Sequence, residues 1–200
     1  MQLISAQPSP FGRKVKVMLI ETDQADAVER VDVMTTPVAT DPKVAAANPV
    51  GKIPALVRED GPTLYDSRVI CRYLDARANA GLYPEARIWD TLTLEATADG
   101  IMDAAVLMVY EHRVRPESLV FEGWIEAQWA KVIRSVNAVN DRWMSHLHGP
   151  FDASHIAMGC ALAYLDFRLG DRDWRTRNKD LTDWFSVFEK RDSMTETAPE

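Results

Sequence analysis

The spacing of apolar residues changes near residue 78, and the stretch before that point alternates short extended runs with helical ones. The predicted extended runs are 2–6, 27–33, 55–58 and 63–65, and the predicted helices are 12–21, 42–48 and 67–77. The last two extended runs flank Asp60-Gly61, a pair typical of a hairpin turn. The order βαβ followed by ββα predicts a small α/β domain over residues 1–78.

Residues 78–84 lack periodicity and are typical of a linker between domains. The sequence after the linker is helical, with predicted helices at 88–114, 118–147, 153–169 and 181–189. We expect the first two to be long and antiparallel, and the third, which is apolar on nearly every side, to lie at the centre of a bundle. Residues 85–200 are therefore predicted to form an all-helical domain.

The helix after Gly12 is amphipathic, which predicts how it packs. Val15 and Leu19 recur at helical spacing and predict a buried face. The basic residues of this helix are expected to face solvent or a site; they are Arg13, Lys14 and Lys16.

Composition narrows the classes of function. The 200 residues are 46% hydrophobic and 26% charged, as in an ordinary globular protein, and the formal net charge of -7 disfavours nucleic acid as a partner. The chain shows neither a secretion signal nor a membrane-spanning run, so we expect a soluble cytoplasmic protein without a membrane partner.

Cysteine and histidine positions give no sign of a metal. Cys71 and Cys160 are far apart in apolar helical patterns, which argues against a disulfide framework and favours a reducing compartment. The four histidines show no metal-ligand spacing, and we expect no metal; they are His112, His146, His148 and His155.

Ser9 places a hydroxyl where the first predicted strand leads into a helix. Serine before proline at a helix start is also a common cap, so capping alone explains the pair Ser9-Pro10. A helix N-terminus offers unpaired N–H groups and a positive dipole end, both suited to a thiolate. Ser9 is thus a candidate hydrogen-bond donor to a sulfur anion, and no Ser-His-Asp set surrounds it in the sequence.

Two later segments can likewise be interpreted either as structural features or as parts of a binding site. Ile53-Pro54 stands before an apolar strand, where a cis bond would turn the preceding backbone outward to bind a peptide as an added strand, although trans proline is commoner. Asp66 and Ser67 stand at the start of a helix, where either residue can cap. The same helix start also suits a carboxylate, and Asp66 suits an ammonium group.

Together these segments resemble bacterial glutathione S-transferases of the serine type. The residues that carry the resemblance are Ser9 to Val15, Asn48 to Leu56 and Tyr65 to Ser67, with further similarity over 98–104 and 159–168. The resemblance covers nearly the whole chain and implies a thioredoxin-like domain followed by an all-helical domain. It also implies glutathione as co-substrate, a homodimer, and transfer of the thiol to a small electrophile, as in detoxification.

The resemblance implies roles for seven residues. Ser9 would stabilise the glutathione thiolate. The other six would hold the tripeptide; they are Phe11, Lys52, Ile53, Pro54, Asp66 and Ser67. Ile53, before a cis proline, would pair with the cysteinyl backbone, and Lys52 would face the glycyl carboxylate. Asp66 and Ser67 would hold the γ-glutamyl end. A lysine in a loop is otherwise simply solvated.

The electrophile pocket is expected beside the first long helix. Met102, Val106 and Tyr110 are spaced to share one face of it, a pattern that a helical core produces as well. Asp99 and Asp103 on this helix are either solvated or, as in some transferases, close to a partner's pocket. Two alternatives remain open: a glutathione-binding protein with little or no turnover, and glutathione-dependent isomerase, peroxidase or dehalogenase chemistry.

One position departs from the family pattern. Members commonly carry Ser or Thr, followed three residues later by Asp, at the start of the buried helix, and here Asp152 and His155 stand in those places. Asp152 can still cap, but His155 in place of a carboxylate puts the usual buried hydrogen bonds in doubt.

Overall fold

The computed structural model describes residues 1–199, and the chain divides into two compact units. One unit comprises Met1–Tyr83 together with residues 195–199, and the other comprises Pro84–Met194. The sequence analysis placed all of 85–200 in the helical domain, whereas the contacts group the last residues with the first unit.

The first unit contains a small mixed sheet with strand order β2-β1-β3. Strands β1 (Gln2–Ser5) and β2 (Glu29–Asp32) run parallel, and β3 (Ala55–Val57) runs antiparallel to β1, with Ile4 opposite Ala55. The second strand of the predicted hairpin is reduced to a single bridge between Leu56 and Leu64.

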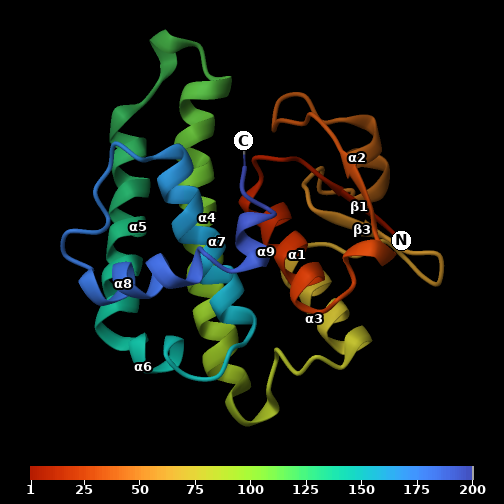
Figure 1. Ribbon diagram of the computed structural model, residues 1–200. Coiled ribbons are helices and arrows are strands. Elements are labelled where there is room, and N and C mark those ends of the chain that lie inside the picture. The colour runs from red at the N-terminus through yellow and green to blue at the C-terminus, as the bar shows by residue number, and fades with distance from the viewer. Residues whose placement is uncertain (200) are drawn as a thin grey trace. The chain divides into compact units, whose positions relative to one another are not determined.

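Three helices accompany this sheet: α1 (Pro10–Glu21), α2 (Pro42–Ala47) and α3 (Ser67–Ala78). A short 3-10 turn, η1 (Ala25–Ala27), precedes β2. α2 contributes Val44 to a core cluster with Ile4, Val33 and Ala55. α1 packs against α3, and Figure 1 shows these two helices side by side, with α2 apart from them. This is the βαβ-ββα order that the residue pattern predicted and the thioredoxin-like arrangement that the resemblance implied.

The basic residues of α1 are not where the sequence placed them. Val15 and Leu19 are fully buried, as predicted. However, Arg13, Lys14 and Lys16 are buried too, with exposed fractions of 8%, 1% and 4%. Burial lowers the pKa of Lys16, because a desolvated ammonium group is less favourable, and nearby Asp32 only partly offsets this. The solvent-facing half of the expectation is therefore wrong for these three side chains, and a site-facing position stays a prediction.

The second unit is helical. Its helices are α4 (Ile88–Val114), α5 (Glu122–Arg142), α6 (Met144–Leu147), α7 (Ala153–Arg168) and α8 (Lys179–Phe188). Two 3-10 turns, η2 (Glu85–Arg87) and η3 (Glu117–Leu119), precede α4 and α5. The boundary between the units falls in α9 (Asp192–Thr195). The predicted helix 118–147 begins later, at Glu122, and is interrupted at Trp143.

α7 is the buried centre of this unit, as predicted, and packs against α4. Gly159 lets α8 approach closely, since a Cβ there would lie 2.6 Å from a ring carbon of Phe188. Among residues 1–199, no helix is both long enough and apolar enough to cross a membrane.

Candidate functional site

Ser9 caps the N-terminus of α1. Its Oγ accepts a hydrogen bond from the backbone N–H of Gly12 at 3.1 Å, and its own N–H donates to the carbonyl of Ala6 at 3.1 Å. The bond from Gly12 uses Oγ as an acceptor and leaves the hydroxyl proton available for donation. The capping interpretation is therefore correct, and it is compatible with donation to a bound anion.

The sheet register brings three predicted segments to one end of the sheet. α1 begins just after β1 ends, and Ile4 of β1 pairs with Ala55 at the start of β3, so Pro54 lies at the same end as the loop before Ser9. Leu64 pairs antiparallel with Leu56, so the chain after Leu64 runs back toward this end and enters α3 there. Residues 9, 53–54 and 66–67 thus lie toward the same end of the sheet.

The loop that leads into β3 is held by Asn48, a residue that the sequence analysis did not single out. Its amide nitrogen donates to the carbonyl of Lys52 at 2.8 Å, and its Oδ1 accepts from the N–H of Val50 at 3.0 Å. Gly51 has φ 71°, in the left-handed region that favours glycine. The Asn-Pro-Val-Gly sequence is a turn signal that could have pointed to Asn48. Lys52 itself is exposed.

The bond between Ile53 and Pro54 is cis, as the resemblance implied. Pro54 is buried and Ile53 half-buried. Phe11, in the first turn of α1, is also half-buried.

Asp66 is the N-cap of α3, and Ser67 is the first residue of that helix. Asp66 Oδ1 accepts from the N–H of Arg68 at 3.0 Å, and Oδ2 pairs with the Arg68 guanidinium at 2.9 Å. Burial alone would raise the pKa of Asp66, but the hydrogen bonds and charge of Arg68 outweigh it and lower the pKa. A hollow of about 400 Å³ lies here, lined by Asp66, Arg68 and Arg72 together with Tyr65 and Val69.

The comparisons with known proteins agree with this architecture. The sequence models of the glutathione S-transferase N-terminal and C-terminal domains match residues 8–77 and 122–186. A glutathione transferase family member from Pseudomonas fluorescens Pf-5, solved with bound glutathione, is 40% identical with a TM-score of 0.96, covering 100% of this chain and 98% of that one. The chain belongs to the glutathione transferase family.

Two further family relatives extend the match. A glutathione S-transferase from Methylobacillus flagellatus KT, solved with GSH bound, is 36% identical with a TM-score of 0.85, covering 100% of this chain and 99% of that chain. The uncharacterized GST-like protein YibF of Escherichia coli K12 is 30% identical over 204 residues, which span 100% of this chain and 98% of YibF.

The residues predicted to line an electrophile pocket all lie on α4. Met102 is fully buried, and Val106 and Tyr110 are half-buried. Their role in an electrophile pocket stays a prediction. Asp99 on the same helix is buried, so the solvated interpretation is wrong for it, whereas Asp103 is exposed.

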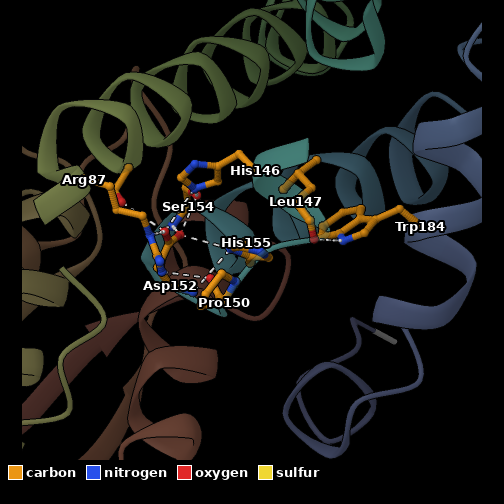
Figure 2. A network of polar contacts seen from close by, with 9 residues as sticks. Arg87, His146, Leu147, Pro150, Asp152, Ser154, His155 and Trp184 are labelled. Atoms are coloured by element: carbon orange, nitrogen blue, oxygen red, sulfur yellow. Dashed lines mark hydrogen bonds and ion pairs between the residues drawn. The ribbon is translucent and has the colours of Figure 1, made fainter. Parts of the chain in front are cut away.

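At the start of α7, the departure from the family pattern still yields a complete capping box. Asp152 Oδ1 accepts from the N–H of Ser154 at 3.0 Å, and the N–H of Asp152 donates to Nδ1 of His155 at 3.2 Å. Figure 2 shows Arg87, His146 and Ser154 also gathered around this carboxylate. Burial alone would raise the pKa of Asp152, but its contacts with His155, Ser154 and His146 hold it well below its usual range.

The structure also brings two histidines together, which their spacing did not indicate. Potential ligand atoms of His146, Asp152 and His155 lie within 4.8 Å of one another. However, both oxygens of Asp152 already accept hydrogen bonds, including one from Arg87 Nε at 3.2 Å and one from Thr91 Oγ1 at 3.0 Å. A metal ion would have to displace these donors beside a guanidinium charge, so the cluster is better suited to hold the helix start.

Proposed function

We propose that this chain binds glutathione and transfers its sulfur to a small electrophile, with Ser9 stabilising the thiolate. The observation that carries the proposal is the position of Ser9. Its hydroxyl caps α1 at the end of the sheet where β3 and α3 also begin. The glutathione bound to its relative from Pseudomonas fluorescens supports the choice of ligand.

Ser9 would act by hydrogen bonding, and it need not attack the substrate itself. A thiol with a pKa near ~8.5 is only slightly ionised at neutral pH, and each unit of depression requires about 1.4 kcal/mol of preference for the thiolate. A hydrogen bond to a charged group contributes roughly 1.5 to 3 kcal/mol. One hydroxyl, polarised by the Gly12 N–H and aided by the α1 dipole, is sufficient for such a shift.

The remaining residues would orient the tripeptide. The main chain of Ile53, at the entry to β3, would pair with the cysteinyl backbone as a short added strand, and Pro54 would fix that entry. Lys52 is exposed and able to meet the glycyl carboxylate. The N-terminus of α3, with Asp66 and Ser67, would hold the γ-glutamyl end.

Catalysis would then come from a higher thiolate concentration and from proximity to the electrophile. The thiolate sulfur attacks the electrophilic carbon and a carbon–sulfur bond forms. In a substitution, the bond to the leaving group breaks and the leaving group carries the negative charge away. In an addition or an epoxide opening, the displaced electron pair moves to an atom of the electrophile, which then takes a proton from water. Met102, Val106 and Tyr110 would line the electrophile pocket, and the active form would be a cytoplasmic homodimer.

Calorimetry followed by a conjugation assay tests the proposal. We expect saturable binding of glutathione and turnover of at least one member of a panel of aryl halides, epoxides, enones and isothiocyanates. Absence of saturable binding overturns the proposal. Binding without conjugation of any panel member would favour a binding protein or the isomerase, peroxidase or dehalogenase alternatives, which assays with those substrates then separate.

A further inference from the structure

The last described residues belong to the unit that carries Ser9, although they lie far from it in the sequence. Residues 195–199 group with Met1–Tyr83, and the C-terminal family match ends earlier, at residue 186. Thr197 is only 5% exposed, whereas its neighbours Glu196 and Ala198 are exposed. One side chain of this tail is therefore specifically buried.

Thr197 is hydrogen-bonded to α1. The Nε of Arg13 donates to Thr197 Oγ1 at 3.3 Å, across a sequence separation of 184 residues. Arg13 itself is 8% exposed, so this contact is shielded from water. The backbone N–H of Arg13 donates to the carbonyl of Ser9 at 2.9 Å, which places Arg13 in the first turn of the helix that Ser9 caps.

We propose that residues 195–199 form a strap, and that Thr197 is a positioning residue for Ser9. The strap acts through Arg13: it restrains the first turn of α1 and thereby the direction of the Ser9 hydroxyl. Thr197 has no role in contacting glutathione. The inference rests on the proposed function, because positioning matters only if Ser9 meets a thiolate.

The physical basis is that helix ends open more easily than helix centres. The first turn of α1 is held by the Gly12 and Arg13 amides, and the side-chain bond to Thr197 adds a tertiary anchor. Hydrogen bonds weaken steeply with distance and angle, so a small displacement of Ser9 reduces thiolate stabilisation. Binding of the peptide backbone, which depends on β3 and α3, is left intact.

The test replaces Thr197 with the isosteric Val and with the conservative Ser, with Glu196→Gln as the matched control on the exposed neighbour. For Thr197→Val we expect roughly a two- to tenfold loss in kcat/KM, the scale of one hydrogen bond, with little change in glutathione affinity. The bound thiol should titrate at higher pH. Thr197→Ser should restore both values, and Glu196→Gln should match the unaltered protein.

Hydrogen exchange supplies a second readout that does not depend on turnover. The Arg13 amide should exchange faster in Thr197→Val than in Thr197→Ser. If the unaltered protein neither binds glutathione nor lowers its thiol pKa, the proposed function fails. If it does both, and Thr197→Val leaves the thiol titration and the Arg13 exchange unchanged, the proposed function stands and the strap is refuted.

Discussion

At the scale of single residues, Ser9 combines a structural and a chemical role in one oxygen atom. The lone pair that accepts from Gly12 N–H stabilises α1, while the hydroxyl proton remains to be donated. Sequence reasoning could name the residue and both roles, because serine before proline at a helix start is a local signal. It could not show that both roles are compatible, since that depends on Ser9 Oγ accepting from the Gly12 N–H and keeping its own proton for donation.

The substitution Ser9→Ala separates these two roles. We expect glutathione binding to persist, the pKa of the bound thiol to rise, and the free energy of unfolding to fall by about 1 kcal/mol through loss of the cap. Ser9→Thr keeps a hydroxyl and is the matched control. Ultraviolet titration of the bound thiolate and urea unfolding measure the two effects, and an unchanged thiol titration in Ser9→Ala would remove Ser9 from its proposed role.

Asp152 illustrates a residue whose importance is visible only in the structure. Its pKa is depressed in the folded protein, so it stabilises the fold at pH values above its unfolded pKa of about 4, and that contribution is lost progressively as the pH falls below this value. Asp152→Asn should reduce the free energy of unfolding by about 1 to 3 kcal/mol at neutral pH, because an amide replaces the buried carboxylate that accepts from Arg87, Thr91 and Ser154.

Urea unfolding of both proteins between pH 7 and pH 2 measures this contribution. The difference between the unaltered protein and Asp152→Asn should shrink as the pH falls below about 4. Asp66→Asn, which alters an exposed cap, should show a smaller difference throughout. A difference for Asp152→Asn that grows as the pH falls below about 4 would contradict the assigned ion pairing.

At the scale of elements, the close approach of α1 to β1 depends on Gly12. A Cβ at this position would collide with Oγ of Ser5, a buried hydroxyl that has no hydrogen-bond partner among residues 1–199. Helix propensity alone favours alanine over glycine by about 1 kcal/mol. The two effects oppose each other, which makes the position informative.

We therefore expect Gly12→Ala to destabilise the protein by about 1 to 3 kcal/mol, as overpacking does, in spite of its better helix propensity. Ser5→Ala should be nearly neutral by itself and should relieve most of the loss in the double variant. Thermal unfolding of the unaltered protein, the two single variants and the double variant measures this double-mutant cycle. Stabilisation by Gly12→Ala would show that helix propensity prevails and that the packing assigned to this contact is wrong.

The helices and strands themselves were largely predictable, because their periods are local. α2, α4 and α7 begin where their proline and aspartate signals or apolar periods indicated. The strand at 63–65 was overestimated, since only Leu64 pairs with Leu56. Its length depends on a partner across the sheet, which periodicity does not report.

At the scale of the whole molecule, sequence reasoning missed side-chain contacts that depend on tertiary packing. The convergence of His146 and His155 on Asp152 spans the turn at Gly149-Pro150, and neither spacing nor composition reveals it. The return of Thr197 to Arg13 joins the two ends of the chain. Such contacts depend on tertiary packing, whereas the glutathione motifs are short segments that topology brings together.

The division into units predicts which residues glutathione will perturb on binding. All seven residues proposed to hold it lie within Met1–Tyr83. Addition of glutathione should therefore perturb amide resonances mainly in this range, first at Gly12, Ile53 and Ser67. Perturbations confined to Pro84–Met194 would contradict the assigned site.

The proposed mechanism requires the hydroxyl of Ser9 to donate a hydrogen bond to the sulfur of bound glutathione. A crystal structure of the complex would locate both atoms. We expect Ser9 Oγ within hydrogen-bond distance of the sulfur, with the cysteinyl backbone against Ile53. A sulfur held by another side chain, with Ser9 Oγ engaged only by the Gly12 N–H, would contradict it.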